Sequence, residues 1–240
     1  MNDRARTEAI GLCEDRAALY RLIATLYFQP LSQEQIDALA SGDLAGAAAQ
    51  ADSPFAGAYA ELYGALRLRH SGTKETLAAD YTGAFYGIRT VGGRTAQPFQ
   101  SLFEKNALGL MGEARSQVYR TFKAHGLRVP EGTDLPEDHL SFITAYLAWL
   151  CDETAEALRA GDDRSAADLI ERQRTFFEAH LASWFPAFRS VANQLVETRF
   201  YRGVLDLTDT KGQRTLVPAH ALAYVQIAAK TERRVGFALH

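Results

Sequence analysis

Cysteine is scarce in this sequence. Cys13 and Cys151 are its only two cysteines, and neither has another cysteine nearby. Disulfide scaffolds and cysteine-ligated zinc sites need such neighbours, so the spacing argues against both. We expect both side chains to be buried as small apolar groups, in a protein of a reducing compartment.

Long apolar runs and an excess of basic residues are missing too. No stretch approaches the roughly 20 apolar residues that a membrane-spanning helix needs. Residues 1–12 carry mixed charges and lack the apolar core of a signal peptide. The formal net charge is −3, whereas nucleic-acid binding proteins usually have a basic footprint. We therefore expect a cytoplasmic protein with no membrane span and no nucleic-acid partner.

The sequence also lacks the pattern typical of β-strands. Strict apolar–polar alternation persists nowhere, whereas three- and four-residue apolar spacing recurs along the chain. This pattern predicts an all-α protein of about ten helices in a single globular domain over residues 1–240, with residues 126–133 as a candidate hinge. Residues 1–13 are expected to form a frayed or weakly helical arm. The expected helical segments are 14–28, 33–40, 44–51, 53–69, 74–86, 104–110, 112–125, 135–160, 164–181, 184–198, 199–208 and 219–233. The expected helix starts include a capping box of Ser32 with Gln35, a cap at Thr73 and a cap at Asp162 or Asp163, and Gly126 is an expected helix end.

The most informative of these segments runs from Leu135 to Cys151. It becomes apolar on two sides, and a helix that is apolar nearly all round is buried. The acid–acid–imidazole triplet Glu137-Asp138-His139 opens it. The residues before and within the first turn fit a helix start: a cap at Thr133 or Asp134, Pro136 in the first turn, and Glu137 and Asp138 near the positive end of the helix dipole.

Three interpretations of this triplet stay open. A helical metal-dependent hydrolase would use Asp138, His139 and His180, but the helix offers no second ligand at the usual four-residue spacing. A structural interpretation has the two acids complement the dipole while His139 packs in the core. A recognition interpretation rests on four carboxylates without a basic residue between positions 131 and 138, namely Glu131, Asp134, Glu137 and Asp138.

Such an acidic patch beside aromatic side chains would suit a cationic, partly apolar partner. A peptide with arginines followed by a hydrophobic stretch meets both needs. The nearby aromatic residues are Tyr81, Phe85, Tyr86, Phe99 and Phe103, and packing in the core is the commoner role for any one of them.

Residues 87–97 form the longest break in the first half of the chain and contain both glycines and arginines. The glycine spacing matches neither the Walker nor the dinucleotide-binding fingerprint, and no strand precedes it. We interpret this segment as a mobile loop between helices.

Four segments between residues 80 and 185 carry patterns that we number in chain order. The first motif is the aspartate–aromatic helix end at residues 80–87. The second is the proline–aromatic–x–serine segment at 97–103. The third is the proline–x–aspartate–histidine segment at 135–140, and the fourth is the histidine–leucine–x–x–tryptophan run at 173–184. Their order resembles the TorD/DmsD/NarJ group of molybdoenzyme maturation chaperones, also called redox enzyme maturation proteins.

The resemblance implies an all-helical chaperone without enzymatic activity or a cofactor of its own. Such a protein would stay in the cytoplasm, bind the twin-arginine signal peptide and the catalytic subunit of a molybdenum oxidoreductase, and delay export until the cofactor is inserted. Some members bind guanine nucleotides or form domain-swapped dimers, so the chain is expected to be a monomer or such a dimer. By this resemblance the peptide-binding residues would be Tyr81, Phe85, Pro98, Phe99, Ser101, Phe103, Pro136, Glu137, Asp138 and His139, with Asp138 facing a peptide groove.

Overall fold

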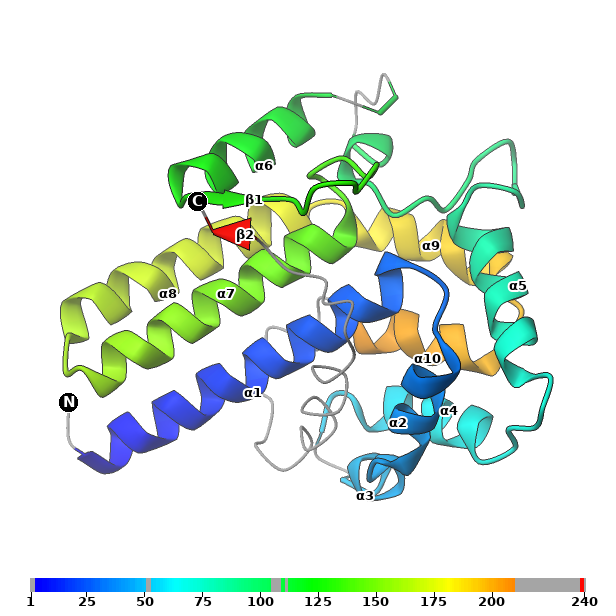
Figure 1. Ribbon diagram of the computed structural model, residues 1–240, viewed down its shortest axis with the longest axis horizontal. Helices are drawn as coiled ribbons and strands as arrows, with labels where there is room; N and C mark the ends of the chain where they lie inside the picture. The colour runs from blue at the N-terminus through cyan, green and yellow to red at the C-terminus, as the bar shows by residue number, and fades with distance from the viewer. Residues whose placement is uncertain (1–2, 51–52, 105–108, 111, 210–237, 240) are drawn as a thin grey trace.

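A computed structural model describes residues 3–50, 53–104, 109–110, 112–209 and 238–239 (Figure 1). Ten α-helices lie within these ranges, which confirms the expected all-α class. They are α1 (Asp3–Phe28), α2 (Gln33–Ser41), α3 (Leu44–Ala48), α4 (Ala56–Leu66), α5 (Thr73–Phe85), α6 (Glu113–Ala124), α7 (Leu140–Arg159), α8 (Asp163–Phe177), α9 (Phe185–Leu195) and α10 (Arg199–Leu207). Short elements complete this part of the chain: the 3₁₀ turn η1 (Gln100–Leu102), the π-helical turn η2 (Glu178–Ala182), and the antiparallel strand pair β1 (Leu127–Arg128) and β2 (Ala238–Leu239).

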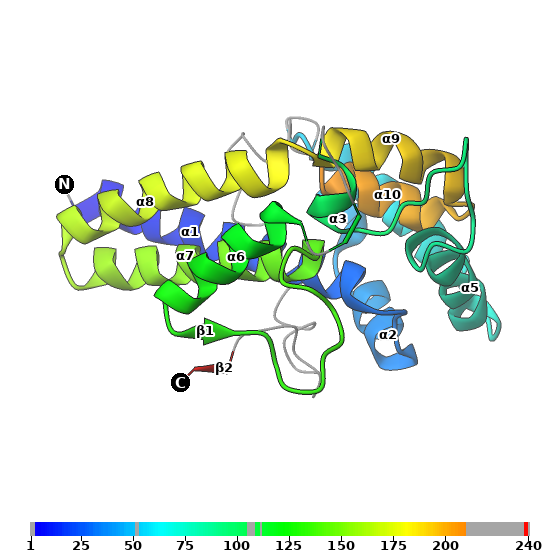
Figure 2. The ribbon, with the colours of Figure 1, turned by 90° about the horizontal axis from the view of Figure 1, so that it is seen from above.

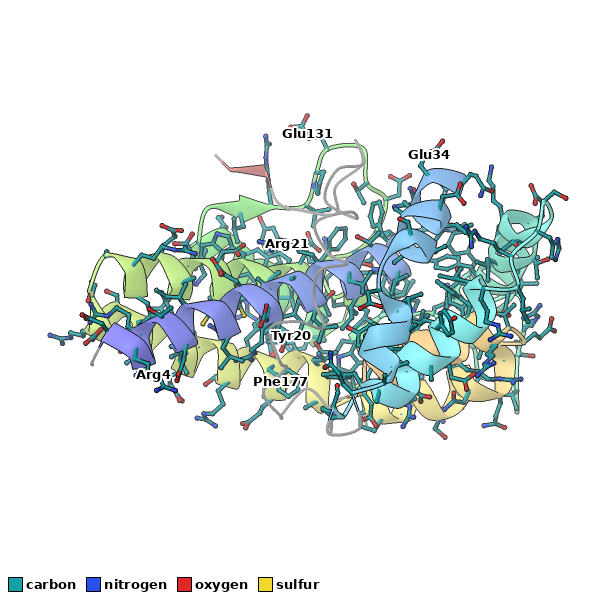
Figure 3. The ribbon with its side chains drawn as sticks, turned by 90° about the horizontal axis from the view of Figure 1, so that it is seen from below. Arg4, Tyr20, Arg21, Glu34, Glu131 and Phe177 are labelled. Carbon is teal, nitrogen blue, oxygen red and sulfur yellow. The ribbon has the colours of Figure 1, made fainter. Side chains whose placement is uncertain are left out.

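Three long helices, α1, α7 and α8, lie side by side along one half of the molecule (Figure 1). The middle one, α7, is buried along most of its length, as its two apolar stripes predicted. An ion pair between Arg21 of α1 and Asp152 of α7 closes the contact between these helices, and Figure 3 shows Arg21 on the side of α1 that faces α7. Helix α6 lies over α7 and α8 (Figure 2).

The other half of the molecule holds α4, α5, α9 and α10 (Figure 1). Helix α10 packs closely on α4, because Gly203 of α10 offers no side chain at the contact. Aromatic rings fill the space between these helices, and Tyr81, Phe85 and Tyr201 are all buried within it. Both cysteines are buried, as expected, and burial raises the pKa of Cys151 to about 12.

Several helix ends follow the sequence signals. Ser32 and Gln35 form the expected capping box of α2, and Asp162 caps α8. Gly126 adopts a φ of +68° directly after α6, as a helix-ending glycine should. The expected cap at Thr73 is wrong, because Gly72 precedes α5 and the Thr73 hydroxyl accepts the backbone N–H of His70.

Residues 1–13, expected as a frayed or weakly helical arm, are helical over their described part, but they are the start of α1 and not a separate arm. Helix α1 begins at Asp3, and Cys13 packs with Ala155, Leu158 and Ala166 in a small apolar cluster of its own. This burial stabilises the first turns of α1, because helical turns without tertiary packing are only marginally stable. The expected run at 104–110 falls largely outside the described residues, and the expected last helix at 219–233 falls wholly outside them. Within the described residues, no helix combines the length and apolarity that crossing a membrane requires.

The contact of α10 with α4 gives a stability prediction. A Cβ at Gly203 would lie 3.0 Å from the Ala58 carbonyl oxygen and 2.9 Å from the Glu61 Cβ. Gly203→Ala should therefore push the two helices apart and lower the free energy of unfolding by about 1–3 kcal/mol. Urea unfolding measures the change.

Gly57→Ala on the facing helix is the matched control, since a Cβ there meets no atom within 4 Å. It should leave stability unchanged or raise it slightly, because alanine favours the helix. Equal stability of the two variants would contradict the close packing of α10 on α4.

Candidate functional site

The second and third motifs meet as a short antiparallel pair. The Leu140 N–H donates to the Pro98 carbonyl oxygen at 2.8 Å, and the Gln100 N–H donates to the Asp138 carbonyl oxygen at 3.1 Å. Between these bonds, Phe99 and His139 are bridge partners with ring centroids 4.9 Å apart. Two segments about forty residues apart in sequence are thus fixed to each other.

Asp138 strengthens this pairing from inside. Its side chain is fully buried, and its Oδ2 accepts the backbone N–H of Ser101 at 2.9 Å. A charge-assisted bond of this kind is stronger than one between neutral groups. Three further buried atoms at the pair, Asp138 Oδ1 and the hydroxyls of Ser101 and Ser141, have no hydrogen-bond partner among the described residues. Buried polar atoms of this kind mark a place where water or a ligand donor binds.

The pairing explains why the helix start differs from the sequence prediction. Helix α7 begins at Leu140 rather than near Leu135, and His139 is its N-cap with extended backbone (φ −67°, ψ 138°). The predicted cap at Thr133 or Asp134 is therefore wrong, and Pro136 to Asp138 precede the helix. The Asp138 carbonyl oxygen accepts the Gln100 N–H of the second motif, and the Pro136 carbonyl oxygen accepts the His139 N–H in a turn, so neither bond belongs to a first helical turn.

His139 is held as a neutral ring. Its Nδ1 accepts the Ser141 N–H at 3.2 Å, which satisfies one of the first donors of α7. Burial disfavours the imidazolium and lowers the pKa of His139 to about 3. The ring therefore caps the helix and packs on Phe99, and it carries no charge at neutral pH.

The fourth motif joins the same place through Gln100. The Gln100 side chain donates to the Ala179 carbonyl oxygen at 3.2 Å, and its Oε1 lies 3.0 Å from His180 Nδ1. The Trp184 Nε1–H donates to the carbonyl oxygen of His180 at 2.5 Å. These acceptors lie on the π-helical turn η2, and burial lowers the pKa of His180 to about 4. We call this meeting point of motifs two, three and four the motif junction.

The sequence interpretation did not single out Gln100 as a site residue. Its one signal was position: a polar residue between Phe99 and Ser101, inside a segment otherwise expected to be buried. Gln100 is 2% exposed, and three of its bonds cross to Asp138, Ala179 and His180. Gln100 links the second motif to the fourth by hydrogen bonds, and the Phe103 ring adds a stacked contact with Trp184 at 6.0 Å.

The first motif connects to this junction through aromatic rings. Tyr81 and Phe85 of α5 are buried, and the Tyr81 hydroxyl donates to the Tyr27 carbonyl oxygen at 2.7 Å. Phe85 stacks on Phe188 at 6.1 Å, and Phe188 in turn contacts Phe103 at 5.5 Å. All four motifs thus belong to one connected interior.

The ten expected peptide-binding residues are therefore brought together, but mostly below the surface. Phe103, Pro136 and Glu137 are half-buried, and the other seven are buried: Tyr81, Phe85, Pro98, Phe99, Ser101, Asp138 and His139. The expectation that Asp138 faces an open groove is wrong for this structure, because the second motif covers its carboxylate.

The expected acidic patch is largely neutralised. Arg115 of α6 donates to Glu137 at 2.6 Å, and Arg128 donates to Glu131 at 2.9 Å. Figure 3 shows Glu131 on the outer edge of the loop that follows β1. Of the four carboxylates, Asp134 alone is both exposed and without a described arginine contact. The count of charged residues between positions 131 and 138 missed Arg115, because this residue lies on α6 and reaches Glu137 only in the folded protein.

The metal-hydrolase interpretation finds no support. Asp138, His139 and His180 each bind a protein donor or acceptor instead of converging on a common point. In the part of the chain that the structure describes, no three His, Cys, Asp or Glu side chains gather as a metal site.

One surface pocket borders the motif junction at His180. Its volume is about 260 Å³, and it lies between α6, α7 and α8. Tyr146, Phe176 and His180 supply aromatic walls, with the Phe176 and His180 rings 4.5 Å apart. Arg172 stands at this pocket with its guanidinium 3.4 Å from His125 Nε2. The pocket has room for one large apolar side chain of a partner.

Comparison with known proteins shows which family models and relatives the chain is similar to. A family model described as nitrate reductase delta subunit matches residues 48–190, and a model of a protein of unknown function matches residues 188–238. The chain is 27% identical to a "Chaperone protein TorD" of Vibrio vulnificus over 81% of its own length and 89% of the relative's. It is 30% identical to a "Chaperone protein TorD" of Vibrio cholerae, covering 76% of this chain and 82% of that one. A "Selenate reductase assembly chaperone protein" of Thauera selenatis is 34% identical over 64% of this chain and 76% of the relative.

The two buried histidines predict acid sensitivity. Both have folded-state pKa values below the ordinary value near 6.5. Below about pH 6.5 these two histidines therefore bind protons in the unfolded chain but stay neutral in the folded chain. The free energy of unfolding consequently falls as the pH drops below about 6.5. At pH 5 the loss should be about 2 kcal/mol per histidine relative to pH 7. Urea unfolding at the two pH values measures it.

His139→Asn isolates one contribution, because asparagine also caps helices but does not titrate. It should remove about half of the stability loss between pH 7 and pH 5 that the two histidines cause. His70→Asn at an exposed position should leave the full loss in place. An undiminished loss in His139→Asn would contradict a neutral, buried His139.

Proposed function

Because the chain belongs to the TorD/DmsD/NarJ family of molybdoenzyme maturation chaperones, we propose that it binds the twin-arginine signal peptide of a molybdenum oxidoreductase. It would also bind the apo form of the catalytic subunit, assist insertion of the cofactor and delay export until the subunit is folded. It would do this in the cytoplasm, without catalysing a reaction. The relatives bear the names of chaperones and assembly proteins, not of enzymes.

The observation that carries this proposal is the motif junction itself. Motifs two, three and four, spread over about ninety residues, are tied to one another at Gln100 and Asp138. Rigid buried contacts of this kind hold neighbouring surface groups in place. The groups at the outer edge of the junction are therefore the best candidates for peptide contact.

We assign the ten candidate residues to two roles. Phe103, Pro136 and Glu137 reach the surface in part and would touch the peptide directly. The buried residues would position them, above all Asp138 and His139, which fix the backbone next to Glu137. Opening of the pair would also expose Asp138 Oδ1, which has no described partner, to a guanidinium.

Charge at the rim supports binding of an arginine pair. At the edge of the junction, the exposed Glu104 accepts from the Gln100 side chain, and the exposed Glu178 begins η2. Glu178 already pairs with Arg174 at 3.1 Å and Glu137 with Arg115 at 2.6 Å, so a leader arginine would share or displace these partners. Arginine prefers such carboxylates, since its planar fork can bond both oxygens. The apolar part of the leader would enter the 260 Å³ pocket beside His180.

Calorimetry with a twin-arginine leader peptide tests the proposal. The peptide should bind, and a version with two lysines should bind about tenfold more weakly, because lysine keeps the positive charge but cannot form the two parallel hydrogen bonds of the guanidinium. Phe103→Ala should also weaken binding, because it removes a half-exposed ring from the proposed site.

Tyr63→Ala is the matched control: this ring is 39% exposed and lies on α4, away from the junction. Its affinity for the peptide should equal that of the unaltered chain. Equal affinity for the arginine and lysine peptides, or equal effects of the two aromatic substitutions, would refute leader binding at the junction.

A further inference from the structure

The loop at residues 87–97 is fastened to the body of the protein by one arginine. The Arg89 guanidinium donates to Asp80 Oδ1 at 2.7 Å and to the Leu195 carbonyl oxygen at 2.9 Å, and it pairs with Glu197 at 3.0 Å. These acceptors come from α5, from the last residue of α9 and from the turn between α9 and α10. Asp80 is 2% exposed, so the guanidinium is drawn to a buried charge.

Gly83 makes the space for this arginine. A Cβ at Gly83 would lie 2.6 Å from the Arg89 Cζ and 2.7 Å from its Nε. The guanidinium thus lies directly against the backbone of α5. Any side chain at position 83 would move it away, and the long arginine side chain can give way without disturbing the helix.

The same loop places a second arginine on an aromatic ring. Val91 and Arg94 pair through two backbone bonds of 2.9 and 3.0 Å, with Gly92 and Gly93 between them at φ of +56° and +74°. This tight hairpin turn needs left-handed backbone at both glycines. It brings the Arg94 guanidinium to 5.7 Å from the centre of the Phe103 ring, a cation–π contact.

Phe103 is one of the half-exposed residues proposed above to touch the leader. We infer that the loop 87–97 is an intramolecular strap: Arg89 latches it, Arg94 covers Phe103, and an arginine of the leader takes the place of Arg94 on that ring. The inference rests on the proposed leader binding and adds its regulation. An arginine of the protein itself occupies the ring until an arginine-bearing peptide displaces it.

The latch can open at small cost to the fold. When Arg89 leaves, Asp80 loses its counter-charge but still accepts the backbone N–H groups of Glu197 and Thr198 at 2.7–3.1 Å, so its oxygens keep hydrogen-bond partners. The apolar anchors of the strap are small: Ala96 is buried in the core and Val91 packs against it, whereas Ile88 is 69% exposed. The first half of the strap therefore depends mainly on the Arg89 contacts.

Three variants test the strap by calorimetry with the twin-arginine peptide. Arg94→Ala uncovers Phe103, Arg89→Ala removes the latch, and Gly83→Ala expels Arg89 without changing any charge. Each should bind the peptide about tenfold more tightly, because a site closed most of the time binds with an affinity reduced by its open fraction. Arg94→Ala combined with Phe103→Ala should lose that gain.

Arg202→Ala controls for net charge. Arg202 is exposed on α10 near the latch and makes no described ion pair, so its removal changes the charge but not the strap. It should bind the peptide like the unaltered chain. Tighter binding by Arg89→Ala and Arg202→Ala alike, with none by Gly83→Ala, would show a charge effect and overturn the strap.

Hydrogen exchange without peptide separates failure of the strap from failure of the proposed function. The amides of Arg89, Val91 and Arg94 are hydrogen-bonded in the closed loop and should exchange faster in Gly83→Ala. If exchange is faster in Gly83→Ala but no variant binds the peptide, the result would support the Arg89 latch and refute leader binding. Peptide binding with unchanged exchange and unchanged affinity would refute the strap.

Discussion

The antiparallel contact between residues 98–101 and 138–140 supports the rest of the structure. It satisfies the first backbone donors of α7, because the Leu140 N–H reaches Pro98 and the Ser141 N–H reaches the His139 ring. Helix α7 is buried against α1 and α8, where free donors would be costly. The same contact brings Gln100 to η2 and thereby joins the last third of the described helices to the centre.

Much of the helical frame could be predicted from the sequence, because helix periodicity and capping are local. The capping box at Ser32, the cap at Asp162 and the stop at Gly126 depend on residues within a few positions. The extended stretch before Leu140 could not, since its hydrogen-bond partners lie about forty residues upstream. Local signals there favoured a helix, and the pairing with Pro98 and Gln100 overrode them.

The sequence predicted that the motif segments would lie together but not how deeply they would be buried. Motif order brought the right segments together, yet sequence cannot tell whether Asp138 faces solvent or a backbone N–H. Nor could charge counting find Arg115, which neutralises Glu137 from another helix. Most polar and aromatic groups of the proposed site are therefore buried, and only a small part of it is exposed for contact with a partner. Substitutions in the buried motif residues should therefore alter stability and binding together, whereas a change at the exposed Arg94 should alter binding alone.

Hydrogen–deuterium exchange with and without a twin-arginine leader peptide tests the central claim most directly, because it reports where the peptide acts on the intact chain. The account predicts altered exchange at residues 87–103 and 135–140, with α4 and the start of α1 unchanged. A peptide that binds and leaves both of those segments unaffected would contradict a leader site at the motif junction.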